Sequence, residues 1–360
     1  MSAMPRIQYF LGANAPGGFY SLYPELLPPD TARAIYILKG GPGCGKSTLM
    51  KQVSTRMEEA GLEAEYILCS GDPDSLDAVV FPQVGVAIVD GTSPHVVEPK
   101  LPGAVERYVN LGDCYDSAAL YPLRQSIMDC MAGYKGCYAR AYRCLDAAAE
   151  LVQDARTLLT TDELEARMAR RAKGILSREL PRVKSDAPGR VRQRFLGAVT
   201  HKGLLCLHDT ALAQCGRVYE LTDRYGLAHE LLLHLLAGIT AAGYDAVACP
   251  DPMAPDRLAH LLVPELGLAF LTATPATRFR GKPHRRLRLE SMAEEDLLRR
   301  SRARLRFARK VAAALTEEAI TSLAQAKAMH DDLEAIYNPH VDFDRVNALA
   351  QRVGDEILSF

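Results

Sequence analysis

The fold is decided by a stretch near the N-terminus, Gly40-Gly41-Pro42-Gly43-Cys44-Gly45-Lys46-Ser47-Thr48. It fits G-x-x-x-x-G-K-[ST], the pattern of a phosphate-binding loop. An apolar run at 34–38 precedes this loop, and a helix-favouring run at 49–53 follows it. Because a strand–loop–helix context distinguishes such a loop from a chance match, we expect an α/β core of the P-loop NTPase type, with a parallel sheet and flanking helices.

Each residue type in the loop has a physical role. The glycines let the backbone curl so that successive N–H groups point at one phosphate. A helix that begins near Lys46 adds the positive end of its dipole. The ammonium group of Lys46 is expected to reach the β and γ phosphates, and the hydroxyl of Ser47 to ligate Mg²⁺. The predicted nucleotide-binding residues are Gly40, Gly41, Pro42, Gly43, Cys44, Gly45, Lys46, Ser47 and Thr48.

A second motif is the apolar run 84–89, which ends in Asp90. This is the Walker B form, in which a carboxylate after a buried strand holds Mg²⁺ through its water shell. The sequence therefore predicts a magnesium site made by Ser47 and Asp90, with Lys46 and Asp90 as catalytic residues. Many P-loop ATPases place a glutamate base directly after this aspartate, whereas Gly91 stands here. We therefore expect slow intrinsic hydrolysis, with the general base unassigned.

Two further residues are candidates for the catalytic machinery. Asp77 ends the acidic run 72–77, which follows a predicted strand at 63–69, at the sheet edge where α/β proteins bind ligands. It could act as a base or position a water molecule, and the alternative is an exposed turn acid. His95 follows Asp90 by five residues and could sense the γ-phosphate, although a lone loop histidine is more often a surface residue.

The first half of the chain recurs in the second half. Phe10-Leu11-Gly12-Ala13 is repeated as Phe195-Leu196-Gly197-Ala198, and the apolar run 84–89 is matched by 266–271. The spacing between matched positions drifts by only three residues, as loop deletions would produce. This is a repeat of whole domains rather than a short-period solenoid.

The duplication predicts two domains of the same design, spanning 1–185 and 186–360. In the first, parallel strands are expected at 33–38, 63–69 and 84–90, with helices between them. Each α/β core is followed by a helical extension rich in Ala, Leu, Glu and Arg.

The second copy lacks the residues that would bind a nucleotide. The alignment pairs Gly40 with Asp223, Gly45 with Ala228, Lys46 with His229, Ser47 with Glu230 and Asp90 with Thr272. Two carboxylates would then lie where phosphate oxygens bind, and like charges repel. We therefore expect one nucleotide site in each chain, in the first half.

The composition is that of an ordinary globular protein, with 360 residues, 48% hydrophobic residues, 24% charged residues and a net charge of −1. No apolar run approaches the length of a membrane span, and the first residues lack the apolar region of a signal peptide. The nine cysteines form no C-x-x-C pair, which is typical of a reducing compartment. We expect a cytoplasmic protein without a membrane partner.

Basic residues are concentrated late in each half, at 167–194 and 285–310. A nucleic acid or an acidic partner is one interpretation. The alternative is a solvated helix face that pairs with glutamates such as Glu294 and Glu295. No aromatic platform accompanies the basic runs, so stacking on a single-stranded nucleic acid is poorly supported.

The motifs extend beyond the loop 40–48 to Phe10-Leu11-Gly12, Gly18-Phe19-Tyr20-Ser21-Leu22 and Val86-Ala87-Ile88-Val89-Asp90-Gly91-Thr92-Ser93-Pro94-His95. Together they resemble a little-characterised family of tandem P-loop ATPases, whose members are described as ATP-binding or nucleotide-kinase-related proteins. In that family both halves often have an intact phosphate-binding loop. In this chain the second half differs from that pattern at every position that would contact phosphate. The resemblance implies ATP binding by the first half and supplies no established substrate.

Three functions remain open as hypotheses. The first is an Mg·ATP-binding protein whose slow hydrolysis is coupled to a conformational change. The second is a small-molecule or nucleotide kinase, in which Asp72, Asp74 and Asp77 would hold an acceptor hydroxyl. The third is a nucleic-acid-associated, ATP-dependent scaffold that uses the basic helices. For the ATPase we expect turnover to need a protein partner or a phosphoacceptor.

Overall fold

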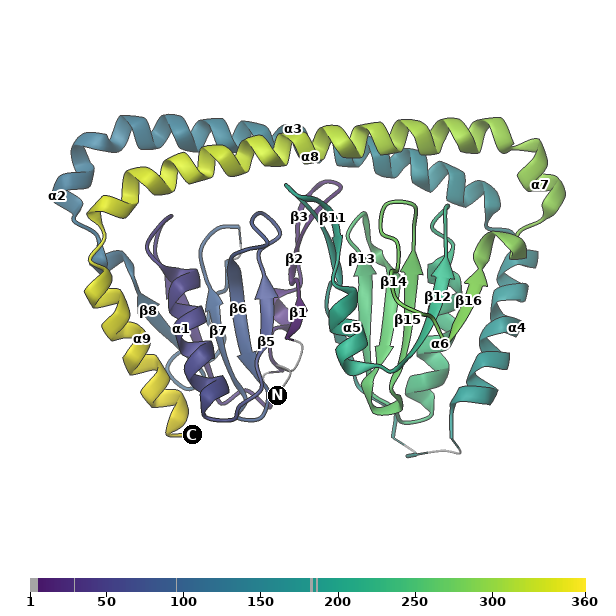
Figure 1. The fold of residues 1–360 in the computed structure, drawn as a ribbon, viewed down its shortest axis with the longest axis horizontal. Coiled ribbons are helices and arrows are strands. Elements are labelled where there is room, and N and C mark those ends of the chain that lie inside the picture. Colours follow the sequence, from purple (N-terminus) through teal and green to yellow (C-terminus); the bar gives the residue numbers. More distant parts are fainter. Residues whose placement is uncertain (1–5, 29, 95, 182–183, 186) are drawn as a thin grey trace.

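The computed structural model describes residues 6–28, 30–94, 96–181, 184–185 and 187–360. Within these ranges the chain forms two six-stranded sheets that stand side by side beneath two long helices (Figure 1). The long helices are α3 (Arg124–Leu159) and α8 (Arg302–Tyr337), each of 36 residues. The predicted α/β class with flanking helices is confirmed.

The first sheet is mixed rather than wholly parallel. Its strands lie in the order β1 (Ile7–Tyr9), β5 (Glu65–Leu68), β6 (Leu76–Phe81), β7 (Val86–Asp90), β4 (Ala34–Lys39) and β8 (Glu106–Asn110). Strand β6 runs antiparallel to both of its neighbours, and the other pairs are parallel.

The predicted helix between the second and third strands is therefore wrong. All six residues of β6 are buried, and four of them are Leu, Val, Val and Phe. A fully buried run of this composition favours a central strand over an amphipathic helix. It forms a hairpin with β7 through a turn at Gly85, whose φ of +66° is in the left-handed region that favours glycine.

The second sheet has the same order of strands as the first. Its strands are β9 (Val191–Gln193), β13 (Ala246–Asp251), β14 (Ala254–Val263), β15 (Leu268–Ala273), β12 (Arg217–Thr222) and β16 (Arg285–Arg288). Strand β14 is antiparallel to β13 and β15, as β6 is to its neighbours. Each half also has a small hairpin, made by β2 (Gly12–Ala15) with β3 (Gly18–Ser21) and by β10 (Gly197–Thr200) with β11 (Gly203–Cys206). This shared order is compatible with the predicted duplication.

The helical extension of each half packs against the α/β core of the other half. Helix α3 leads to α4 (Asp162–Glu179), which lies on α6 (Ala228–Ala241) of the second half. Helix α8 returns to the first half, where α9 (Phe343–Leu358) lies on α1 (Lys46–Glu59). Apolar residues of α9 accordingly belong to the first core, and those of α4 to the second. The shorter helices are α2 (Ser117–Leu120), α5 (His208–Gln214) and α7 (Glu295–Arg300).

Short 3₁₀ turns connect several of these elements. They span Tyr23–Glu25, Gly112–Cys114, Tyr121–Leu123, Pro264–Leu266, Leu289–Met292 and Asn338–His340.

The repeated Phe-Leu-Gly-Ala motifs meet where the two halves join. The backbones of Phe10 and Phe195 exchange N–H···O hydrogen bonds of 2.9 Å in both directions. Next to them the buried guanidinium of Arg194 donates to Glu65 Oε1 at 2.7 Å and to the carbonyl of Glu25 at 2.7 Å. A buried cation held in this way is fully paired, which explains why it is tolerated in the seam.

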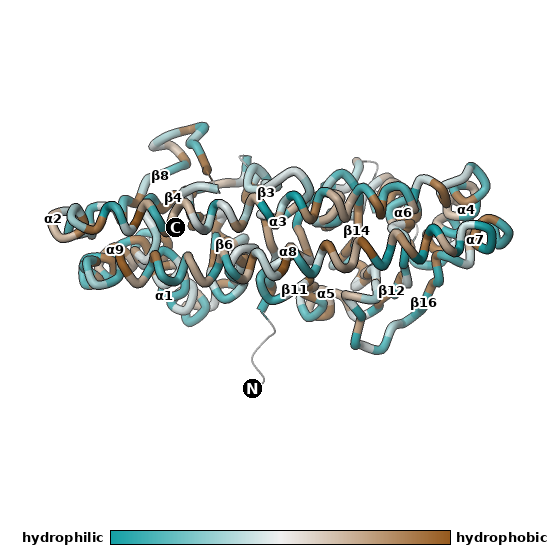
Figure 2. Tube along the Cα trace, turned by 90° about the horizontal axis from the view of Figure 1, so that it is seen from above, coloured by the Kyte–Doolittle hydropathy of each residue, from teal (hydrophilic) through white to brown (hydrophobic). Residues whose placement is uncertain are grey.

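Figure 2 shows α3 and α8 side by side along the molecule, with hydrophilic and hydrophobic residues alternating along both. Among the described residues, no helix combines the length and the apolarity that crossing a membrane would require.

Candidate functional site

The loop between β4 and α1 has the curled backbone that its sequence predicts. Strand β4 ends at Lys39 and α1 begins at Lys46. Gly43 has φ +69° and Gly45 has φ +86°, both in the left-handed region that L side chains rarely adopt. A Cβ atom on Gly40 would lie 2.6 Å from Cys44 Sγ, so a side chain at this position would force the Cys44 side chain to shift.

The structure brings Lys46 and Asp90 together. The Nζ atom of Lys46 lies 3.7 Å from Asp90 Oδ2, and it donates to the carbonyl oxygens of Gly40 and Gly41 at 2.8 Å each. Asp90 Oδ1 accepts hydrogen bonds from Thr92, at 2.8 Å from the backbone N–H and 2.6 Å from the hydroxyl. Both charged side chains are mostly buried, with 13% and 12% exposed, so their attraction is screened less than on an open surface.

The start of α1 lies against the turn between β5 and β6. The hydroxyl oxygen of Ser47 accepts the backbone N–H of Leu76 at 3.0 Å. Lys51 Nζ donates to the carbonyl of Asp74 at 2.8 Å. Thr48 is exposed on the first turn of α1. Ser47 thus stands on the same turn as Lys46, next to the edge of the sheet from which Asp90 projects.

Asp77 is buried within β6, so its alternative interpretation as an exposed turn acid is wrong. Its side chain is 3% exposed, and Oδ2 accepts the hydroxyl of Tyr23 at 2.9 Å. Burial, followed by the nearby Asp77 carboxylate, raises the pKa of the Cys69 thiol well above its usual range. His95, the other candidate, lies outside the described residues.

Helix α8 supplies residues to this loop that the sequence analysis did not identify. Glu334 Oε1 accepts the backbone N–H of Gly43 at 3.3 Å. A Cβ atom on Gly43 would lie 2.6 Å from Asn338 Oδ1, which shows how closely the end of α8 approaches. These residues belong to the helical extension of the second half, and no local pattern links them to the loop.

Tyr115 holds the loop from the side of α2. Its hydroxyl donates to the carbonyl of Pro42 at 2.7 Å. Burial raises the pKa of Tyr115 and also that of the Cys44 thiol, so both groups stay protonated near neutral pH. A protonated Tyr115 can keep donating this hydrogen bond across that range.

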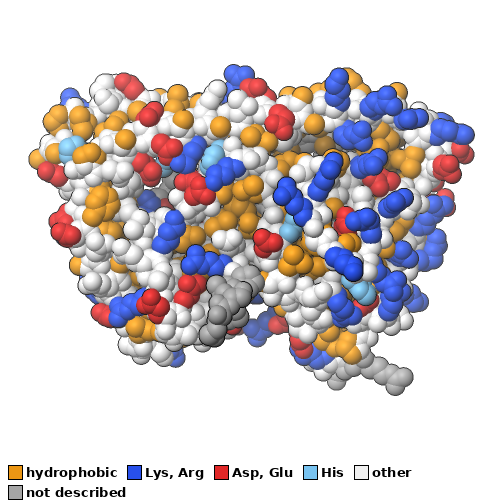
Figure 3. Space-filling view, viewed as in Figure 1, with side chains coloured by type: hydrophobic (Ala, Val, Ile, Leu, Met, Phe, Trp, Pro, Cys, Tyr) orange, Lys and Arg blue, Asp and Glu red, His pale blue; other side chains and the backbone are white. Residues whose placement is uncertain are grey.

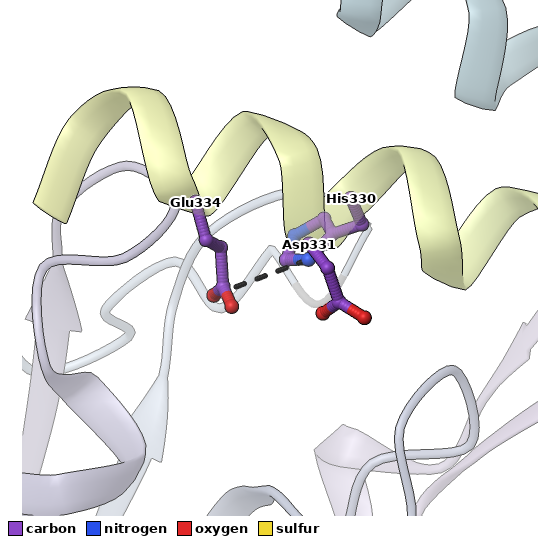
Figure 4. Close-up of side chains that lie close together, drawn as sticks. All are labelled: His330, Asp331 and Glu334. Atoms are coloured by element: carbon purple, nitrogen blue, oxygen red, sulfur yellow. Dashed lines mark ion pairs between the residues drawn. The ribbon is translucent and has the colours of Figure 1, made fainter.

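One grouping near the loop has the residue types of a metal site. Figure 4 shows His330, Asp331 and Glu334 projecting from the same side of α8. Their ligand atoms lie within 4.8 Å of one another, and His330 Nδ1 is 3.9 Å from Glu334 Oε1. Asp331 also pairs with Lys327. An ordinary i,i+4 arrangement on a helix accounts for these contacts.

The loop of the second half is one residue shorter, which corrects the sequence alignment there. It spans 223–227, and α6 begins at Ala228, the structural counterpart of Lys46. His229 corresponds to Ser47, because its Nδ1 accepts the N–H of Leu258 at 2.9 Å as Ser47 accepts that of Leu76. Both alignments leave this half without a lysine at the position of Lys46.

A carboxylate fills the second loop from within. The Asp223 side chain accepts the backbone N–H groups of Tyr225 and Gly226 at 2.9 Å each and of Ala228 at 2.8 Å. These donors are the kind that would bind phosphate oxygens in an intact loop. Glu230 is paired with Arg257 at 2.8 Å. Asp223 therefore occupies the N–H donors that a phosphate would need in the second loop.

Figure 3 shows Lys and Arg side chains gathered over the second half of the molecule. Several basic residues of this half and of α4 have acidic partners, which favours the alternative of a solvated surface, although the ion pairs described in the structure do not include Glu294 or Glu295. The pairs include Arg167 with Glu163, Arg217 with Glu179, Arg286 with Glu220, Arg299 with Asp296 and Arg304 with Asp154.

Comparisons with protein-family models, with curated proteins and with solved structures found no match to this chain. The function is therefore inferred from the site itself.

Proposed function

We propose that the first half binds Mg·ATP at the loop between β4 and α1 and hydrolyses it slowly. The observation that carries this proposal is the 3.7 Å approach of Lys46 Nζ to Asp90 Oδ2 at a loop with two left-handed glycines. A site for a metal–phosphate complex needs a cation that contacts the phosphates and a carboxylate that holds the water shell of the metal. Lys46 and Asp90 are of these two types. Their convergence from separate motifs supports a shared ligand.

The residues present fit both groups of the ligand. Backbone N–H groups at a helix N-terminus suit a polyphosphate, and the Lys46 ammonium, now bonded to two loop carbonyls, can turn to phosphate oxygens instead. The Ser47 hydroxyl and the Asp90 carboxylate offer the oxygen ligands that Mg²⁺ prefers. When bound, Mg²⁺ would neutralise charge on the phosphates, while Lys46 orients them.

The kinase alternative has weaker support. Its proposed acceptor site consists of Asp72, Asp74 and Asp77. Asp72 lies 3.5 Å from Lys327 Nζ, Asp74 pairs with Lys202, and Asp77 is bonded to Tyr23. Carboxylates engaged in this way are poorly placed to hold an acceptor hydroxyl.

Titration calorimetry tests the proposal directly. Mg·ATP is expected to bind once per chain, and Lys46→Ala is expected to abolish binding. His229→Ala, on the first turn of α6 in the second half, is the control and should leave affinity unchanged. Two equivalent sites, or full affinity in Lys46→Ala, would contradict the proposal.

A further inference from the structure

A carboxylate from the second half of the sequence contacts the proposed phosphate site. Glu334 Oε1 lies 3.3 Å from the N–H of Gly43, inside the G-x-x-x-x-G-K loop. Backbone N–H groups of such a loop are donors for phosphate oxygens. Glu334 therefore presents an anion to a donor that the nucleotide would also use.

The position of Glu334 has a counterpart in the other half. Glu334 lies three residues before the end of α8, and Arg156 lies three residues before the end of α3. Arg156 faces the second loop, where a Cβ atom on Gly226 would lie 3.7 Å from its Cδ and Nη1 atoms. Each long helix thus brings one charged residue to the loop of the other half.

The two helix residues have opposite charges, and so do the contents of the two loops. The second loop already contains the Asp223 carboxylate, and it faces the Arg156 guanidinium. The first loop presents N–H donors and is followed by Lys46, which is paired with Asp90, and its Gly43 N–H meets the Glu334 carboxylate. Glu334 therefore complements the charge of a loop that has no internal anion of this kind.

We propose that Glu334 competes with the nucleotide phosphates for the first loop, so that Mg·ATP binding displaces it and releases the end of α8. This inference rests on the proposed function. A carboxylate and a phosphate repel at short range, so the two cannot share the Gly43 donor. Because α8 begins beside the second core, where Leu305 and Ala308 are buried, its displacement links nucleotide binding to the arrangement of the two halves.

The affinity of Glu334→Gln for Mg·ATP tests the competition. Glutamine keeps the size of the side chain and removes its charge, so Mg·ATP is expected to bind about tenfold more tightly. Asp332→Asn makes the same charge change at an exposed position two residues away and should leave affinity unchanged. Unchanged or weaker affinity in Glu334→Gln would overturn the proposal.

Hydrogen exchange on the unmodified protein supplies a second, independent measurement. Mg·ATP is expected to speed exchange across 330–342, the end of α8 and the turn after it, because the contact with Gly43 is lost. Slower or unchanged exchange there, with Mg·ATP bound, would overturn the release. If the unmodified protein binds no Mg·ATP, or if Lys46→Ala binds it equally well, the proposed function itself fails and this inference fails with it.

Discussion

Lys46 Nζ and Asp90 Oδ2 lie 3.7 Å apart because two neighbouring parallel strands end at the same edge of the first sheet. In the register of β4 and β7, Leu38 stands opposite Asp90. The loop that follows β4 is therefore held beside the carboxylate that ends β7. The pairing of these strands, rather than any local motif, joins the two predicted motifs into one site.

The Asp90→Asn variant tests the metal role of this carboxylate. We expect ATP binding to lose most of its dependence on Mg²⁺, because the amide can still accept the hydrogen bonds of Thr92 but has no charge to orient metal-bound water. ATP titrations over a series of Mg²⁺ concentrations measure this. Asp113→Asn, an exposed carboxylate of the same half, is the control. If Asp90→Asn leaves Mg²⁺ dependence and turnover intact, the Walker B assignment is wrong.

The conformation of the loop between β4 and α1 can be predicted from the sequence, because its backbone turns depend on glycines within the loop itself. Gly43 and Gly45 adopt left-handed φ values, and the helix begins at Lys46 as expected. The antiparallel strand β6 was missed because a short buried run has no periodicity that separates a strand from a helix segment. The acidic run 72–77, which leads into β6, is also typical of a loop that precedes a helix.

The contact between Glu334 and Gly43 could not be predicted from local pattern. It depends on α8 returning across the molecule to the first half, and amphipathic periodicity does not specify which sheet a helix covers. The sequence predicts only part of the difference between the two loops, and it does not predict that the Asp223 side chain binds the N–H groups of the second loop. The lost lysine was visible in the alignment, whereas the three N–H bonds of Asp223 depend on a deletion that the alignment placed differently.

The Asp223→Ala variant should destabilise the protein without creating a second nucleotide site. Three N–H groups of the second loop would lose their acceptor, which we expect to cost about 1–3 kcal/mol of unfolding free energy. Urea unfolding measures the loss, and Asp223→Asn, which keeps one oxygen acceptor, should lose less. Mg·ATP stoichiometry should stay at one per chain because Ala228 stands at the position of Lys46. A second binding event in Asp223→Ala would show that occupation by Asp223 alone had blocked this loop.

Acid should weaken the fold through His260. Burial lowers the pKa of His260 to about 3, while Nδ1 accepts the N–H of Thr272 at 3.1 Å. An unfolded histidine takes up a proton below about pH 6.5, and the folded one does so only near pH 3. The unfolded state therefore binds more protons in this window, and stability falls as the pH falls, by about 1.4 kcal/mol per unit from this group.

The His260→Asn variant isolates this contribution. Asparagine offers an acceptor for Thr272 and does not titrate, so the acid dependence of its unfolding free energy should be shallower by about that amount. Urea unfolding between pH 4 and pH 7 provides the measurement, and His234→Asn, at an exposed position, is the control. The same slope in His260→Asn and the unmodified protein would exclude His260 as the source.

Basal ATP hydrolysis should be slow, because the position of the usual base has no room for one. Gly91 follows Asp90, and a Cβ atom there would lie 2.3 Å from Ile37 Cγ2. Asp77, the candidate for the missing general base, is buried and accepts a hydrogen bond from the Tyr23 hydroxyl. A general base typically contributes about 10²–10⁴-fold, so turnover without one should fall well below about 1 s⁻¹. Phosphate release from the purified protein measures this rate, with and without candidate acceptors and partners. A fast basal rate that survives both Asp77→Asn and His95→Ala would show that another residue acts as the base.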